Sequence, residues 1–170
     1  MQKTRRSPNE LQNITHLGCK ETKYQTDYNP ALLESFPNKH PNKDQWVSCV
    51  CTEFTSLCPI TNQPDYARIF INYIAGEALV ESKSLKLYLF AFRNHGDFHE
   101  DCIQKICNDI TNLINPKYLE AIGEFTPRGG ISIYPFSSYH NGESKYEEIY
   151  IRRLISYVPG KFTMNLGRPY

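Results

Sequence analysis

The sequence predicts an α+β fold in which two strands, two helices and two further strands follow one another. Residues 45–54 and 66–74 alternate β-favouring side chains with a period of two. Residues 85–92 and 97–114 instead carry apolar side chains at helical spacing, and residues 118–125 and 131–136 return to a strand pattern. This ββααββ order places helices on one face of an antiparallel sheet. The other face is left to be buried by something else, for which oligomerisation is the natural candidate.

Composition indicates one domain. The chain has 170 residues, of which 40% are hydrophobic and 22% charged, and its formal net charge is +1. This length suffices for a hydrophobic core without disulfides or a structural metal, and the charge gives no general attraction to nucleic acid or to anionic membranes. No stretch approaches about 18 uninterrupted apolar residues, and the polar start of the chain lacks the apolar run of a signal peptide. We therefore expect a cytoplasmic protein without a nucleic-acid or membrane partner.

Six cysteines raise the question of a disulfide framework. Such frameworks belong to short secreted chains with a signal sequence, which is not recognisable here. Free thiols in a reducing compartment are therefore expected.

Three regions follow one another along the chain. Residues 1–44 are rich in Asn, Pro, Lys and Thr and are interpreted as an N-terminal arm that packs on the core. Residues 45–140 form the predicted catalytic domain. Residues 141–170, after the polar break at Asn141 and Gly142, form a C-terminal tail to which no motif assigns a role.

The segment between the first two strands, residues 55–65, is predicted to be a shaped loop because it holds two prolines and several turn formers. Cys58 and Asp65 lie on it. A loop thiol is accessible, but a nucleophile also needs a neighbour that raises its thiolate fraction above about 3% at neutral pH. Asp65 could return toward Cys58 and donate or accept a proton, or it could simply begin the next strand.

The two helices begin in segments rich in polar groups. Residues 80–86 place a carboxylate, two hydroxyls and two cations at the start of the first helix, where free backbone N–H groups favour anions. In the second helix Asp97 and Glu100 form a plausible capping pair, and a carboxylate there could also accept two parallel hydrogen bonds from a guanine-like ring. Ordinary helix capping explains both segments equally well.

The last two strands are expected to meet at the turn of residues 126–130. Arg128, beside Gly129 and Gly130, could bind a phosphate through its fork of donors or could be an ordinary solvated turn residue.

These segments together resemble the QueF family, the 7-cyano-7-deazaguanine reductases of queuosine biosynthesis. The resemblance extends from about Glu34 to Ile133, and its single-domain length is similar to that of the unimodal (type I) branch. The runs that carry it are Phe54-Thr55-Ser56-Leu57-Cys58-Pro59, Gln63-Pro64-Asp65, Glu81-Ser82-Lys83-Ser84-Leu85-Lys86, Phe92-Arg93-Asn94-His95-Gly96-Asp97-Phe98-His99-Glu100 and Phe125-Thr126-Pro127-Arg128-Gly129-Gly130.

The resemblance implies a tunnelling fold that assembles into barrels as stacked homo-oligomeric rings, with sites between neighbouring subunits. It also implies an oxidoreductase that reduces the nitrile of 7-cyano-7-deazaguanine to an aminomethyl group with NADPH, through a covalent thioimide, and that needs no metal. Carried over residue by residue, it makes Cys58 the nucleophile and Asp65 the proton donor. The substrate would be bound by Val80, Glu81, Ser82, His99 and Glu100, and NADPH by Lys83, Lys86 and Arg128.

Two alternatives remain open from the sequence. A zinc-dependent GTP cyclohydrolase-like or pterin enzyme of the same fold could use Cys58, His95 and His99 as metal ligands. A non-catalytic RNA-binding or scaffolding module could use Lys83, Lys86, Arg128 and surface tyrosines as a basic, aromatic patch.

Overall fold

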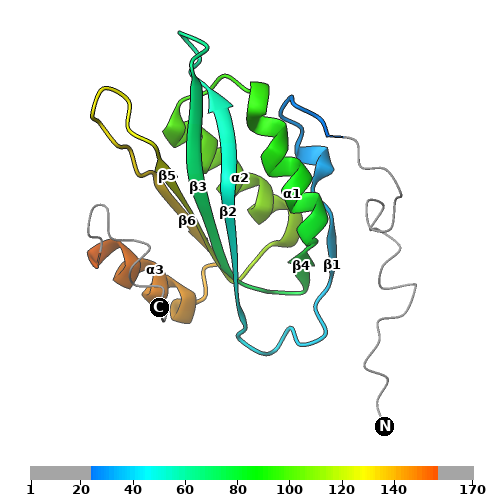
Figure 1. Ribbon diagram of the computed structural model, residues 1–170. Coiled ribbons are helices and arrows are strands. Elements are labelled where there is room, and N and C mark those ends of the chain that lie inside the picture. Colours follow the sequence, from blue (N-terminus) through cyan, green and yellow to red (C-terminus); the bar gives the residue numbers. More distant parts are fainter. Residues whose placement is uncertain (1–23, 157–170) are drawn as a thin grey trace, which may run out of the picture.

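A computed structural model describes residues 24–156 of the chain. A four-stranded antiparallel sheet with the order β2-β3-β5-β6 forms its centre (Figure 1). Its strands are β2 (Trp46–Leu57), β3 (Pro64–Ile74), β5 (Tyr118–Phe125) and β6 (Phe136–His140). A second, two-stranded sheet pairs β1 (Ser35–Pro37) with β4 (Ala78–Val80).

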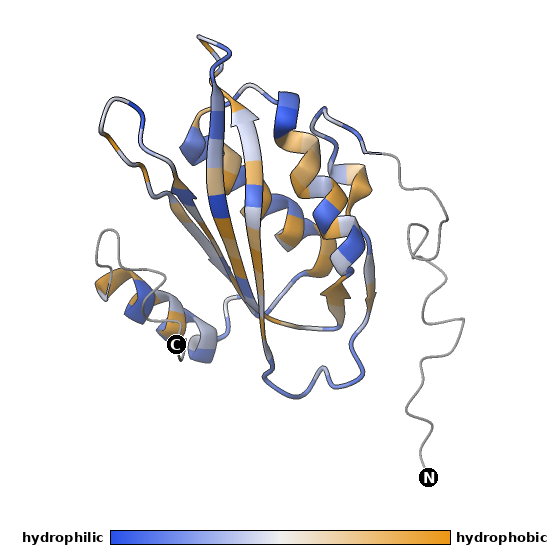
Figure 2. Cartoon of the chain, in the orientation of Figure 1, coloured by the Kyte–Doolittle hydropathy of each residue, from blue (hydrophilic) through white to orange (hydrophobic). Residues whose placement is uncertain are grey.

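Two helices, α1 (Ser82–Phe90) and α2 (His99–Ile114), cover one face of the central sheet, with a 3-10 turn (Ala91–Asn94) between them. The predicted ββααββ order is therefore confirmed. Figure 2 shows apolar residues on the sides of both helices that face the sheet. The alternation predicted for β3 is confirmed as well. Ala67, Ile69, Ile71 and Tyr73 are each 5% exposed or less and belong to the core beneath the helices.

The opposite face of the sheet is partly covered by a third helix, α3 (Ser144–Ile155), which the sequence did not predict (Figure 1). Tyr146 of α3 packs with Ile74 and Tyr118 of the sheet. A buried ion pair adds to this contact, because Arg153 donates from Nε and a terminal nitrogen to Glu120 of β5 at 2.8 and 3.1 Å. The two predicted helices thus lie on one face as expected, and an additional helix covers part of the second face, which is not left entirely to another molecule.

The last strand begins later than predicted. Residues 131–135 still run beside β5, since Gly123 N–H donates to the Pro135 carbonyl at 3.0 Å and Phe125 N–H to that of Ile133 at 3.2 Å. Pro135 has no N–H to continue the ladder, so regular pairing starts at Phe136.

The start of α2 also differs from the expected capping pair. Its N-cap is Phe98, which makes no side-chain cap hydrogen bond. Asp97 Oδ1 accepts from the N–H of Phe98 at 3.1 Å, while Asp97 Oδ2 binds Lys105 at 2.7 Å and His95 at 3.1 Å. The Asp97 carboxylate thus binds three groups that are not part of a capping box, instead of capping α2.

The described residues include parts of the expected arm and tail. Tyr28 donates to Asp109 Oδ2 of α2 at 2.7 Å, and Tyr146 donates to Asp44 at 2.7 Å. Residues 1–23 and 157–170, which complete the arm and tail, lie outside the described residues. Between residues 24 and 156, no helix has the length and apolar character that crossing a membrane requires.

Candidate active site

The loop that carries Cys58 is held closed by backbone hydrogen bonds. Cys58 N–H donates to the Gln63 carbonyl at 2.9 Å, and Asn62 N–H donates back to the Cys58 carbonyl at 3.0 Å. Asn62 adopts φ 55°, a left-handed conformation that asparagine tolerates better than most residues. Leu57, the residue before Cys58, donates from its N–H to the His95 carbonyl at 2.9 Å, and its carbonyl accepts from the N–H of Asp97 at 3.1 Å. The loop is therefore fixed at both its base and its turn.

Cys58 lies in this loop as a polarised thiol that is only 6% exposed. Its pKa falls from the ordinary 9.0 to about 6, chiefly because the Thr61 side chain hydrogen-bonds to it. The backbone groups of Thr61 and Ile60 and the side chain of Arg128 add to this effect, while burial opposes it. A thiol with such a pKa is roughly nine-tenths thiolate at pH 7. A thiol with this lowered pKa has the chemistry that a nucleophile needs.

Asp65, His99 and Arg128 meet at the same end of the sheet. Because the sequence predicts that they act on the reaction with Cys58, we call these four residues the catalytic cluster. Asp65 is 2% exposed and is the second residue of β3; its Oδ1 lies 3.0 Å from Arg128 Nε and its Oδ2 lies 3.1 Å from His99 Nε2. The His99 ring stacks on Phe125, with 3.9 Å between ring centroids and 10° between the planes. Its Nδ1 is buried and has no hydrogen-bond partner among the described residues.

Arg128 reaches the cluster from a two-residue turn. Its backbone exchanges hydrogen bonds with that of Ile131, both at 3.0 Å, and the two residues between them, Gly129 and Gly130, have φ 58° and 83°. Positive φ at both central positions is the requirement of this hairpin turn, and glycine meets it without strain. The turn predicted at residues 126–130 is present, but its arginine points to Asp65 and His99 rather than into solvent alone.

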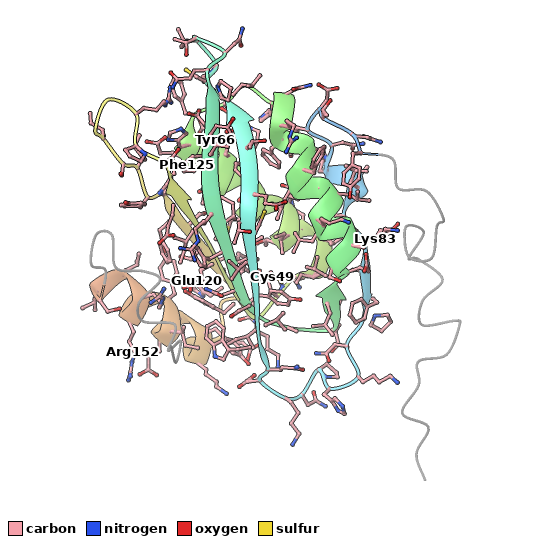
Figure 3. The ribbon with its side chains drawn as sticks, viewed as in Figure 1. Cys49, Tyr66, Lys83, Glu120, Phe125 and Arg152 are labelled. Atoms are coloured by element: carbon pink, nitrogen blue, oxygen red, sulfur yellow. The ribbon has the colours of Figure 1, made fainter. Side chains whose placement is uncertain are left out.

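The residues expected around the start of α1 lie at the other end of the sheet. Val80 N–H donates to the hydroxyl of Tyr73. Tyr73 lies eight residues after Asp65 in β3, and eight residues of extended strand span roughly 26 Å. Figure 3 likewise shows Lys83 on the α1 side of the molecule, away from Tyr66 and Phe125. Within one chain, Val80, Glu81, Ser82 and Lys83 are therefore separated from the catalytic cluster.

A groove of about 400 Å³ runs between β2 and α1, and Ser82 and Lys86 line it together with Cys49 and Cys51. The Glu81 side chain caps α1 by accepting from the N–H groups of Lys83 and Ser84 at 2.9 and 2.7 Å. These backbone donors are therefore used within the helix, and it is the lysine side chains that could attract an anion.

Glu100 stands in the first turn of α2, next to His99, and its side chain is exposed. Phe98, on the other side of His99, is 52% exposed. Of the five residues expected to bind the substrate, the structure thus brings His99 into the catalytic cluster, places Glu100 beside it in the first turn of α2, and leaves the other three at the far end of the sheet.

Comparison with known proteins identifies the family. The family model described as QueF-like protein matches residues 64–144. The NADPH-dependent 7-cyano-7-deazaguanine reductase of Bdellovibrio bacteriovorus is 56% identical over 168 residues, which cover 99% of this chain and 98% of that protein. The enzyme of the same name from Staphylococcus haemolyticus is 57% identical over 152 residues, or 89% of this chain and 92% of that protein.

The chain belongs to the family of NADPH-dependent 7-cyano-7-deazaguanine reductases. A crystal structure of the archaeosine synthase QueF-Like in the apo form has a TM-score of 0.54, with 18% identity, and covers 59% of this chain and 98% of that one. At this identity the likeness shows a shared fold, which agrees with the α+β arrangement described above.

The zinc-dependent alternative requires a set of converging metal ligands. From residue 24 to residue 156, no three His, Cys, Asp or Glu side chains converge in a way that could hold a metal ion. His95 contacts Asp97, whereas His99 contacts Asp65 and Arg128. The two histidines thus serve different neighbours.

Two contributors to the reductase's cluster were missed in the sequence, namely Thr61, which polarises Cys58, and Phe125, which supports the His99 ring. Thr61 follows Cys58 by three residues within one turn, and this spacing could have indicated it. Phe125 lies on a strand distant in sequence, so no local signal pointed to it.

The five cysteines of the described region, including Cys49, Cys51 and Cys58, are free thiols.

Proposed function

We propose that this chain reduces the nitrile of 7-cyano-7-deazaguanine to the aminomethyl group with NADPH, through a covalent thioimide on Cys58, in queuosine biosynthesis. The observation that carries the proposal is the polarised Cys58 thiol, whose pKa Arg128 helps to lower while also binding Asp65 and His99, in a chain 56% identical to a reductase of that name across nearly its whole length.

The reaction follows from the charges of the cluster. The Cys58 thiolate gives its electron pair to the nitrile carbon, and one π pair of the triple bond moves to the nitrogen, which takes a proton that Asp65 and His99 relay from solvent. This step converts an unreactive nitrile into a thioimide. When bound, NADPH supplies a hydride to the former nitrile carbon in each of two successive reductions. Between them the C–S bond breaks and its electron pair returns to Cys58, leaving an imine for the second hydride and a further proton.

The start of α1 fits the phosphates of such a cofactor. Lys83 and Lys86 are three residues apart and therefore lie on one side of the helix. The first turn of α1 contains no acidic residue, and Lys86 lines the 400 Å³ groove. We assign these two lysines, with Arg128, to cofactor binding, and Val80, Glu81 and Ser82, with His99 and Glu100, to substrate binding.

Both groups of residues can serve one reaction if a neighbouring subunit supplies the α1 side. We therefore propose a homo-oligomer of stacked rings with sites between subunits. Three exposed apolar side chains around the catalytic cluster support it, since Ile60, Phe98 and Ile131 are 79%, 52% and 69% exposed. Apolar groups clustered in this way are typical of protein contacts. The free thiols support a reducing, cytoplasmic location.

The proposal is tested by intact mass spectrometry after mixing with 7-cyano-7-deazaguanine and no NADPH. The wild-type protein is expected to gain the mass of one substrate molecule per chain, and Cys58→Ala is expected to gain none. Cys107→Ala is the matched control, since Cys107 is a buried helix cysteine with a pKa raised by burial, and it should form the adduct. A folded, reduced wild-type protein that forms no adduct would contradict the proposal.

Glu100→Gln tests the proposed recognition of the guanine-like edge. The Gln amide oxygen can still accept one of the two hydrogen bonds, but its NH2 group leaves the other ligand donor unpaired, which costs about 1–3 kcal/mol, or roughly ten-fold to a hundred-fold in kcat/KM. Steady-state kinetics should place most of this loss in the KM for the substrate and little in the KM for NADPH. Glu147→Gln, an exposed glutamate of α3, is the control. Unaltered kinetics for Glu100→Gln would remove Glu100 from the substrate site.

A further inference from the structure

Arg128 contacts two other members of the catalytic cluster, Asp65 and His99. Its Nε lies 3.0 Å from Asp65 Oδ1, and a terminal nitrogen lies 3.3 Å from His99 Nε2. Its guanidinium is also one of the groups that hold the pKa of the Cys58 thiol below its usual range. A residue reserved for a cofactor phosphate would not need these contacts, so its position among the reacting groups asks for a separate explanation.

The balance of charge around Asp65 explains the position of Arg128. Asp65 is 2% exposed, and a carboxylate so deeply buried needs a partner, which the Arg128 guanidinium provides. Arg128 itself is about one third exposed, since its side-chain exposure is 32%. It thus reaches from the surface to the buried acid. The fork of the guanidinium holds several donors in one plane, which allows one arginine to serve a carboxylate, an imidazole nitrogen and a thiolate together.

We propose that Arg128 is a catalytic residue of the nitrile addition. Before NADPH binds, its guanidinium stabilises the Cys58 thiolate and neutralises the Asp65 carboxylate. This inference rests on the proposed function for its substrate. It assigns Arg128 to the covalent step itself, whether or not the same side chain later contacts a phosphate. The proton that Cys58 loses goes to solvent, and the sulfur keeps the electron pair that attacks the nitrile carbon.

The groups that face the thiol determine how it titrates. From its own loop these are the Thr61 hydroxyl and the backbone of Ile60 and Thr61, and from the turn of residues 126–130 it is Arg128. Asp65 of β3 and His99 of α2 act through Arg128. Nearby, Asp97 binds the side chains of His95 and Lys105. The backbones of His95 and Asp97 are hydrogen-bonded to that of Leu57. Among the groups of the described residues that lower the pKa of Cys58, Arg128 is the one cation, and its removal should therefore disfavour the thiolate.

The test is the rate of Cys58 alkylation by iodoacetamide as a function of pH, followed by peptide mass spectrometry, in the absence of substrate and cofactor. The wild-type rate should rise with a midpoint near pH 6, in line with the pKa of Cys58. In Arg128→Gln the midpoint should move upward by about one pH unit or more, the usual effect of losing a neighbouring opposite charge. Arg128→Lys keeps the charge and loses the fork, so its midpoint should lie between the two.

Arg68→Gln is the matched control, because Arg68 is a sheet arginine paired with Glu124 at 3.4 Å and is not part of the cluster. It should keep the wild-type midpoint. Circular dichroism of each variant verifies the fold, and if Arg128→Gln does not fold, the midpoint of Arg128→Lys decides. Unchanged midpoints in the folded Arg128 variants, with only the KM for NADPH raised, would overturn the proposal and leave Arg128 as a phosphate contact. Because alkylation requires no substrate, this result is independent of whether 7-cyano-7-deazaguanine is the substrate.

Discussion

Asp65→Asn is expected to lower kcat by about 10²- to 10⁴-fold, the usual contribution of a positioned acid or base. Asparagine has nearly the same shape as aspartate, and its amide oxygen can still accept from Arg128 Nε, which lies 3.0 Å from Asp65 Oδ1. It cannot carry or pass a proton beside His99. The loss should therefore fall on the chemical steps, while the KM for NADPH changes little. Oxidation of NADPH, followed by its absorbance with saturating substrate, measures kcat directly.

Asp101→Asn is the control for this prediction, because Asp101 is exposed in the first turn of α2, close to His99 in sequence but outside the cluster. Its kcat should stay within about two-fold of the wild-type value, as expected for a surface substitution away from the chemistry. If Asp65→Asn turned over at the wild-type rate, the proton would have to come from another group, and His99 or water would take its place.

Glu120→Ala is expected to lower the free energy of unfolding by about 1–3 kcal/mol, the cost of leaving the donors of Arg153, Asn72 and Tyr118 without their acceptor. Glu120 is 2% exposed and receives hydrogen bonds from Asn72 at 2.9 Å and Tyr118 at 3.0 Å in addition to the two from Arg153. Figure 3 shows it between the sheet and α3. Urea denaturation followed by circular dichroism measures the change.

Glu148→Ala provides the comparison, since Glu148 pairs with Arg152 on the exposed side of α3 and such pairs contribute about 0–1 kcal/mol. The double variant Glu120→Ala with Arg153→Met should recover part of the lost stability, because it removes the unpaired charge as well. Equal effects of Glu120→Ala and Glu148→Ala would mean that the buried pair does not attach α3 to the sheet.

The sequence predicted most of the fold because most of its elements have strong local patterns. In β3 every second residue is apolar and buried, and the buried face of α2 includes Ile103, Ile106 and Ile110 at helical spacing. Helix α3 has no comparable pattern, since Tyr146 is its only fully buried residue among those described. It is attached instead by Arg153, whose partner Glu120 lies 33 residues away, and nothing local identifies that pairing.

The candidate site was predictable in its residue types but not in its arrangement. Cys58 and Asp65 share one loop and its strand, so their proximity could be expected. Arg128 comes from a turn more than sixty residues later, and its contact with Asp65 depends on the pairing of β3 with β5. The distance between Val80 and the cluster likewise depends on tertiary structure, because it is set by the length of β3.

The closed loop around Cys58 has a consequence for the timing of catalysis. Its backbone is fixed by the bonds from Cys58 to Gln63 and from Asn62 to Cys58, and by the pairing of Leu57 with His95 and Asp97. The entropy of ordering this segment is therefore lost when the chain folds, not when a ligand arrives. If Cys58 attacks the nitrile as proposed, the substrate meets a sulfur whose position is already fixed, and the loop need not rearrange between substrate binding and bond formation.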